Sequence, residues 1–268
     1  GKGNWDKLDP AIARIEAARA AGHRITADMY TYTAGSTGLD AAMPPWVQAG
    51  GVESWTQRLK DPTTRAKVIA EMRQDKPAFE NLYRHAGAEG TLLVGFKNPA
   101  LKGLTGKTLA QVAKDRGVSP EDAAIDLVIE DGSRVQVVYF LMSEQNVARQ
   151  TALPWMSFGS DASAQAPEGV FLKSSTHPRA YGNFARLLGK YVREEKTTSL
   201  ADAVRRLSAF PAQNLGLKDR GMLKAGYYAD VVVFDPATIG EVGTYEQPKQ
   251  FAVGVSDVFV NGRQALKD

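Results

Sequence analysis

Short apolar segments typical of β-strands alternate along the chain with segments of helical spacing, and this alternation limits the folds that the chain can adopt. The strand-like segments are residues 25–30, 91–96, 134–141, 155–160 and 230–234. The helix-like segments are residues 9–22, 61–86, 108–116, a stretch that begins at Ser119, and residues 143–153, 182–194 and 199–209. Strands that alternate with helices favour an α/β fold with a parallel sheet. The length of 268 residues allows two modest domains or one barrel-sized domain.

Two regions depart from the alternation. Residues 33–60 are rich in glycine, proline and tryptophan, and they predict an irregular segment. From residue 230 onward, strand signals follow one another without helices between them. We therefore expect the C-terminal end of the chain to be rich in β-structure.

Composition and charge exclude several classes of protein. The 33 Lys and Arg residues exceed the 30 Asp and Glu residues by only 3 and are scattered, so a nucleic-acid partner is not expected. No stretch reaches the ~20 apolar residues that a membrane span needs, and no signal-peptide pattern is present. We therefore expect a cytoplasmic protein without a membrane partner. The absence of cysteine excludes disulfides, thiolate metal ligands and a cysteine nucleophile within this chain.

The segment from Trp155 to Asp161 carries the strongest chemical signal. An apolar strand ends in small residues and then in one carboxylate, and a long loop with proline and glycine follows. In a β/α barrel the catalytic groups lie where strands end. Asp161 could bind a metal there, or take a proton from an activated water and pass it to a leaving amine. The alternative is a turn or helix-capping residue, which is a common role for aspartate after a strand.

Other polar residues near predicted strand ends are candidates for substrate contacts. Residues 28–36 are the end of one predicted strand and the hydroxyl-bearing residues that follow it. Residues 139–142 end the strongest predicted strand and could present a phenol and a flexible apolar wall to a substrate. Core packing is the alternative for both segments. His177 precedes a proline in a polar loop and could orient a substrate or be an ordinary loop histidine. The three histidines form no HxH or HxxxH pair, which argues against a histidine-based metal site within this chain.

Several of these segments together resemble one known family. Signatures of the N-acyl-D-amino-acid deacylases, or D-aminoacylases, of the metal-dependent amidohydrolase superfamily are similar to residues 25–37 (ITADMYTYTAGST), 138–144 (VYFLMSE), 157–161 (SFGSD) and 176–182 (THPRAYG). The general C-terminal signature of that superfamily resembles residues 211–217 (PAQNLGL) and 229–236 (ADVVVFDP). The resemblance covers essentially the whole chain.

The resemblance implies a zinc-dependent hydrolase that cleaves the amide bond of small N-acyl-D-amino acids to a carboxylate and a D-amino acid. The implied fold is a distorted TIM-like (β/α)8 barrel with a small β-sandwich. Residues 1–215 would be part of the barrel, with an inserted segment at about 33–134, and residues 216–268 would be the C-terminal part of the small β domain.

The resemblance also assigns site residues. Asp161 matches the position of the catalytic proton shuttle and is a possible zinc ligand. The residues that match substrate-binding positions are Tyr30, Ser36, Tyr139, Met142 and His177.

The chain departs from the family pattern where the metal is concerned. The family's histidine ligands and metal-binding cysteine are absent, and we expect them upstream of Gly1. The chain therefore resembles the C-terminal portion of a longer enzyme whose N-terminal half is its missing partner, and alone it is expected to be inactive. Thr31 also stands where proline is usual in the family. The alternatives are a non-catalytic module and a related amidohydrolase of cyclic amides, such as a dihydroorotase or hydantoinase.

Overall fold

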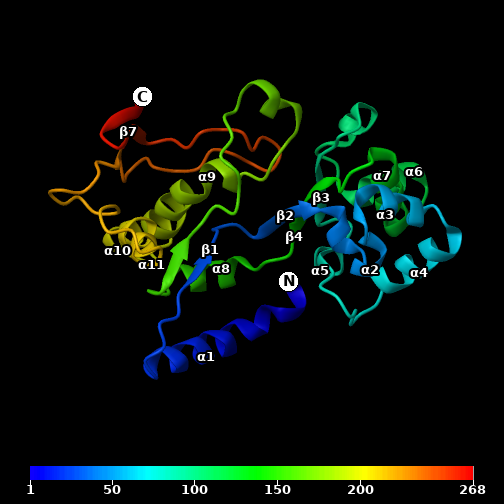
Figure 1. Cartoon of the computed structure of the whole chain (residues 1–268), viewed down its shortest axis with the longest axis horizontal. Coiled ribbons are helices and arrows are strands. Elements are labelled where there is room, and N and C mark those ends of the chain that lie inside the picture. Colours follow the sequence, from blue (N-terminus) through cyan, green and yellow to red (C-terminus); the bar gives the residue numbers. More distant parts are fainter. Residues whose placement is uncertain (268) are drawn as a thin grey trace. The chain divides into compact units, whose positions relative to one another are not determined.

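The structure is a computed structural model that describes residues 1–267, and its chain divides into two compact units (Figure 1). Unit 1 contains Gly1–Asp6, Thr33–Ser143 and Ala166–His177. Unit 2 contains Lys7–Tyr32, Glu144–Gln165 and the chain from Pro178 onward. Both units combine helices with strands, so the mixed α/β class is confirmed. The domain boundary at residues 215–216 stays a prediction.

Unit 1 contains a three-stranded antiparallel sheet. Its strands are, in order, β2 (Ala34–Gly38), β4 (Gln136–Phe140) and β3 (Thr91–Gly95). Gly35 lies opposite Tyr139, and Leu93 lies opposite Val137. The parallel sheet expected from the alternation of strands and helices is therefore wrong for this unit. Helical connections do not set strand direction by themselves, because they are required between parallel strands but also occur between antiparallel ones.

The helices of unit 1 differ from the sequence prediction in two places. They are α2 (Pro45–Gln48), α3 (Gly51–Leu59), α4 (Pro62–Met72), α5 (Leu82–Ala86), α6 (Leu109–Arg116) and α7 (Pro120–Asp131), with the 3₁₀ helices η2 (Leu39–Ala42), η3 (Pro99–Leu104) and η4 (Gly169–Lys173). Residues 33–60 are thus not irregular, and their helices form because Trp55 and Leu59 reach the apolar core from one face of α3.

The second difference is that residues 61–86 form two helices instead of one. Asn81 interrupts the helical pattern because its side chain serves the ends of both helices. Its amide donates to the Met72 carbonyl, the last residue of α4, at 3.0 Å, and its Oδ1 accepts from the Arg84 N–H at 3.0 Å as the cap of α5. The helix predicted to begin at Ser119 is confirmed as α7, which the Ser119 side chain caps and Pro120 opens.

The core of unit 1 is a continuous apolar cluster. Trp55, Leu93, Ile125 and Tyr139 belong to it, and each is at most 2% exposed. The central strand β4 is buried along Val137, Val138 and Tyr139, as its apolar sequence predicted. Unit 1 therefore derives its packing mainly from the non-directional burial of apolar surface.

Unit 2 contains a parallel pair of short strands, β1 (Ala27–Met29) and β5 (Met156–Phe158), with Asp28 opposite Ser157. The helical segments are η1 (Lys2–Lys7, mostly in unit 1), α1 (Leu8–Ala20), α8 (Glu144–Thr151), α9 (Arg179–Arg186), the π-helix η5 (Leu187–Glu194), α10 (Leu200–Leu207) and α11 (Ala209–Asn214). The predicted helices at residues 9–22, 143–153, 182–194 and 199–209 correspond to α1, α8, α9 with η5, and α10. Across residues 1–267, no helix has both the length and the apolar character that a bilayer span requires.

The C-terminal part of unit 2 is an antiparallel sheet in the order β6–β7–β8. Its strands are β6 (Val231–Phe234), β7 (Val255–Val260) and β8 (Arg263–Lys267). The β-rich end expected from the sequence is therefore confirmed. Val232, Val233 and Val260 are each about half exposed.

Candidate active site

Asp161 lies three residues after the end of β5. Its backbone φ of +48° falls in the left-handed region, which aspartate tolerates better than most residues. Its Oδ2 lies 2.8 Å from Nη2 of Arg179; the Asp161 side chain is 71% exposed, and the Arg179 side chain is 5% exposed. The same Nη2 donates to the Asp161 carbonyl at 2.7 Å. A buried cation thus holds both the backbone and the carboxylate of an aspartate that remains open to solvent.

Tyr30 directly follows β1, so it lies at the same edge of the parallel pair as the segment after β5. The Arg179 Cζ atom lies 4.4 Å from the centre of the Tyr30 ring, which is a cation–π contact. Burial raises the pKa of Tyr30, Arg179 lowers it and Asp161 raises it, and the net pKa lies above 10.0. The phenol is therefore neutral near pH 7 and able to donate a hydrogen bond. The structure thus brings Tyr30 and Asp161 into contact with the same side chain, that of Arg179.

Arg179 was not identified from the sequence as a site residue, although it lies within the segment 176–182. The signal was present in its position, because it is the arginine that opens the helix after the candidate carboxylate. A charge pair between a loop and a helix beyond it depends on tertiary contacts, which spacing alone does not show.

Ser36 and Tyr139 lie in unit 1 on the neighbouring strands β2 and β4. The Ser36 hydroxyl donates to the Val137 carbonyl at 3.0 Å. Tyr139 is fully buried, and its hydroxyl donates to the Gly38 carbonyl at 3.1 Å. Burial raises the pKa of Tyr139 far above its ordinary range, so its hydroxyl stays protonated. A substrate contact by either residue stays a prediction.

Met142 and His177 lie near one end of the same sheet. The Met142 N–H donates to the Thr33 carbonyl at 2.9 Å, just beyond the Ala34–Phe140 pair. His177 is 2% exposed, and its Nε2 lies 2.9 Å from the Ala34 carbonyl oxygen. This hydrogen bond requires the tautomer with a proton on Nε2. Unit 1 thus gathers His177 and Met142 at the start of β2, and their substrate-binding role stays a prediction.

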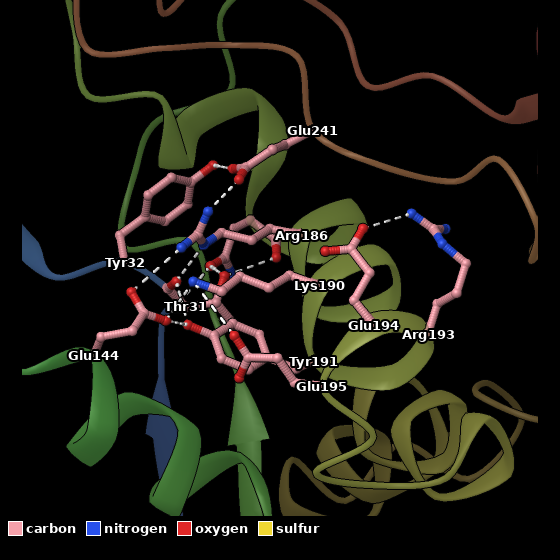
Figure 2. A network of polar contacts seen from close by, with 11 residues as sticks. Thr31, Tyr32, Glu144, Arg186, Lys190, Tyr191, Arg193, Glu194, Glu195 and Glu241 are labelled. Carbon is pink, nitrogen blue, oxygen red and sulfur yellow. Dashed lines mark hydrogen bonds and ion pairs between the residues drawn. The ribbon is translucent and has the colours of Figure 1, made fainter.

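A polar cluster in unit 2, centred on Arg186, was missed by the sequence analysis (Figure 2). Arg186 donates through Nε to the Thr31 carbonyl at 2.7 Å and forms an ion pair with Glu241. A third contact joins its Nη2 to Glu144 Oε2 at 3.6 Å. The hydroxyl of Tyr32 donates to Glu241, and the Arg186 guanidinium lies 4.9 Å from the centre of the Tyr32 ring. The chain that follows Tyr30 is therefore held by charge and by hydrogen bonds.

Glu144, at the start of α8, extends this cluster (Figure 2). It accepts from Lys190 Nζ at 2.6 Å and from the Tyr191 hydroxyl. Burial raises the pKa of Glu144, but the hydrogen bonds from Lys190 and Tyr191 and the charges of Lys190 and Arg186 outweigh it and hold the pKa below 4.5. Glu144 is therefore ionised at neutral pH and pairs with the cations around it.

The described residues do not provide a complete metal site. Within residues 1–267, no group of three or more His, Cys, Asp or Glu side chains is arranged to hold a metal ion. A catalytic zinc is usually held by three protein ligands. Asp161 by itself therefore accounts for at most one ligand.

Comparisons with known proteins place the chain among characterised relatives. Residues 132–265 match the model of the family described as "Amidohydrolase family". The chain is 38% identical to a D-aminoacylase of Alcaligenes xylosoxydans xylosoxydans over 159 residues, which cover 59% of the chain and 30% of the relative. It is 31% identical to an N-acyl-D-glutamate deacylase of the same organism over 259 residues, which cover 97% of the chain and 42% of the relative.

A solved structure extends the likeness to the fold. The N-acyl-D-glutamate deacylase of Bordetella bronchiseptica, complexed with zinc and a phosphonate inhibitor that mimics the tetrahedral intermediate, matches with a TM-score of 0.73 and 28% identity. The match covers 98% of the chain and 44% of that protein. The chain thus spans less than half the length of the relatives that it resembles.

Proposed function

The chain belongs to the D-aminoacylase family of the amidohydrolase superfamily, and we propose that the protein containing it hydrolyses the amide bond of N-acyl-D-amino acids. The observation that carries the proposal is the position of Asp161, which is exposed at the end of β5 and held there by the buried Arg179. Carboxylates at strand ends are where this class of fold carries its chemistry.

Asp161 would transfer one proton in this reaction. It would accept the proton of a water molecule as the water oxygen bonds to the amide carbonyl carbon. It would then donate that proton to the nitrogen as the carbon–nitrogen bond breaks. The products are a carboxylic acid and a D-amino acid, and at neutral pH the acid loses its remaining proton to the amine, which leaves a carboxylate and an ammonium group. Arg179 would keep Asp161 oriented through its contact with Oδ2, and the neutral phenol of Tyr30 would donate a hydrogen bond to the substrate.

The reaction is proposed to depend on zinc, which is present in the solved N-acyl-D-glutamate deacylase. The described residues do not fit a complete zinc site, since none of them form a group of three or more His, Cys, Asp or Glu side chains that could hold a metal ion. We therefore propose that the remaining ligands come from outside these 268 residues, in an N-terminal half of the same protein. The lengths of the relatives support this proposal, because the chain covers only 30% to 44% of them.

The finer fold assignment is part of the same proposal. The parallel pair β1–β5 would be two strands of a distorted (β/α)8 barrel, and residues 33–134 would be an insertion into it. The sheet β6–β7–β8 would be one part of a small β-sandwich, whose other strands lie outside the chain. Val232 and Leu266 both lie opposite Val258, so they share one face of the sheet, and their exposure (55% and 41%) supports a covered face in the longer protein.

The test is Asp161→Asn in the intact protein that contains this chain, assayed with N-acyl-D-amino acids and zinc. Asparagine has nearly the same shape, tolerates a positive φ, and can still accept from Arg179, but it cannot take up a proton. We expect kcat to fall by about 10²–10⁴-fold with little change in folding. The matched control is Asp219→Asn, an exposed aspartate of unit 2, which should leave kcat unchanged.

Three outcomes would contradict the proposal. Near-normal kcat in Asp161→Asn would make Asp161 a turn residue. A wild-type protein that opens dihydroorotate or hydantoin rings but leaves linear N-acyl-D-amino acids intact would favour the cyclic-amide alternative. Inactivity toward both classes would favour a non-catalytic module.

A further inference from the structure

One face of helix α9 carries three polar side chains that bind the segments after β1 and β5. Arg179, Asn183 and Arg186 are spaced by four and three residues, so they lie on the same side of the helix. Arg179 donates to the Asp161 carbonyl at 2.7 Å, Asn183 to the Gly159 carbonyl at 3.0 Å, and Arg186 to the Thr31 carbonyl at 2.7 Å. These carbonyls belong to the two segments that carry the proposed catalytic aspartate and Tyr30.

Asn183 joins both segments through a single amide group. Its Oδ1 accepts from the Thr31 N–H at 2.8 Å and from the Thr31 hydroxyl at 3.0 Å, while its Nδ2 donates to the Gly159 carbonyl at 3.0 Å. The opposite orientation of the amide would place Nδ2 against the Thr31 N–H, two donors facing one another, so the contacts define the orientation. Asn183 is 1% exposed and Thr31 is fully buried, so water cannot replace these bonds.

The two residues that the Asn183 side chain binds lie close to the proposed site residues in the sequence. Thr31 is the residue after Tyr30, and Gly159 is two residues before Asp161. The Gly159 N–H also donates to the Met29 carbonyl at 3.1 Å, which extends the parallel pairing by one bond. A displacement of either segment would therefore break the amide link and change the separation of the phenol from the carboxylate.

Threonine at position 31 is what makes the link possible. A proline at this position would have neither an N–H nor a hydroxyl to donate. Thr31 supplies both donors, and its hydroxyl also lies 3.1 Å from the Asn183 carbonyl.

We infer that Asn183 is a positioning residue, which sets the distance between Tyr30 and Asp161 by tying Thr31 to Gly159. The inference rests on the proposed function for its catalytic consequence. Asn183 acts through the backbone of both segments, so its replacement should lower kcat more than it weakens substrate binding.

The decisive variant is Asn183→Asp in the intact protein. Aspartate has the same shape and keeps both acceptor contacts with Thr31, but it places an oxygen against the Gly159 carbonyl in place of the donor. We expect kcat to fall at least ~10-fold with KM changed less than ~2-fold, since small misplacements of reacting groups are costly. The matched control is Asn214→Asp, an exposed asparagine of unit 2, which should leave both constants unchanged.

Amide hydrogen exchange provides a readout that does not require activity. In Asn183→Asp, exchange should quicken in peptides covering residues 158–161, while the sheet β6–β7–β8 keeps its wild-type rate. Thr31→Val, which keeps the N–H and the side-chain volume but loses the hydroxyl, should quicken exchange at residues 29–32 and lower kcat less than Asn183→Asp. If Asn183→Asp does not fold, Thr31→Val with the same two measurements decides the question.

The inference is overturned if exchange rises uniformly over unit 2, or if kcat falls only in proportion to the folded fraction, since both would make Asn183 merely structural. Normal kcat with normal exchange at residues 158–161 would overturn it as well. A wild-type protein without deacylase activity would contradict the proposed function instead, and the exchange pattern would still decide whether Asn183 ties the two segments together.

Discussion

The two units differ in the contacts that surround their strands. Unit 1 packs an antiparallel sheet into a continuous apolar cluster in which Trp55, Leu93 and Tyr139 are buried. In unit 2 the strands of the parallel pair also pack in apolar clusters, around Phe158 and around Met156, but buried polar side chains, among them Asn183 and Arg206, bind the backbone next to them. Apolar burial is non-directional, whereas hydrogen bonds and ion pairs act only in a narrow range of geometry. The directional bonds of unit 2 therefore restrict the backbone segments that carry Tyr30 and Asp161.

The largest stability effect is expected when a buried arginine of unit 2 is replaced, so that its partners lose their donor. Arg206 is fully buried, donates to the carbonyls of Thr151 and Leu153, and pairs with Asp202 at 2.8 Å. Arg206→Met should destabilise the protein by about 3–5 kcal/mol, because it leaves the buried carbonyls of Thr151 and Leu153 without their donor and removes one of the cations that pair with Asp202. The free energy of unfolding from denaturant titration measures this loss.

A neighbouring arginine is the control for Arg206. Arg205 pairs with the same Asp202 at 2.8 Å, but its side chain is 41% exposed. Arg205→Met should cost only about 0–1 kcal/mol, the usual worth of an exposed ion pair. Equal losses in the two variants would contradict the view that unit 2 depends on its buried polar groups.

Removal of a buried side chain from the apolar core of unit 1 should lower the stability of that unit. Leu93 on β3 is fully buried, and Leu93→Ala should cost about 2–5 kcal/mol through lost burial and the cavity that remains. Hydrogen exchange should quicken in unit 1 while the parallel pair of unit 2 keeps its protection. Val233→Ala, at a residue 45% exposed on β6, is the control and should have little effect. Equal quickening in both units would mean that they unfold as one.

The smallest expected effect is the response to acid, which both units share. Burial raises the pKa of Glu121 in unit 1, but hydrogen bonds from Arg73 and Tyr83 outweigh it and hold the pKa below 4.5. Glu144 in unit 2 is held below 4.5 in the same way by Lys190, Tyr191 and Arg186. A carboxyl whose pKa is lowered on folding stabilises the protein above its ordinary pKa, and this contribution is lost as the pH falls through the lowered value.

The measurement is Tm as a function of pH from about 6 to about 3. Tm of the wild type should decrease as the pH falls below 4.5, and Glu121→Gln and Glu144→Gln should each flatten that decrease. Glu53→Gln, at an exposed position on α3, is the control and should follow the wild-type curve. A wild-type Tm that does not change below pH 4.5 would contradict both assignments.

Local signals in the sequence predicted elements well where a cap or an apolar run decides the structure. Ser119 with Pro120 marks the start of α7, and the run through Val138 marks β4. Strand direction in unit 1 could not be predicted, because it depends on which strands meet. In the site, Asp161 and Tyr30 were identified from their places after strands and from family likeness.

The residues that hold the site were not predicted. Arg179, Asn183 and Arg186 act on backbone carbonyls far away in the sequence, and such contacts leave no local pattern. Their spacing along one face of α9 was visible, but a polar face on a helix usually indicates exposure to solvent. The burial of these side chains is a tertiary property.

The hydrogen bond between Met142 and Thr33 has a consequence for the order of folding. It joins the two ends of the long segment of unit 1, which lies between β1 and β5 in the sequence. Before unit 1 folds, the pairing of β1 with β5 must close the whole loop from Met29 to Met156, at an entropic cost. Once this segment of unit 1 has folded, its two ends are adjacent. The loop that remains to be closed then consists only of the two stretches that join these ends to β1 and to β5. During synthesis the segment Thr33–Ser143, which contains the three strands of unit 1, can form before β5 is made, and the parallel pair then assembles as a late, short-range step.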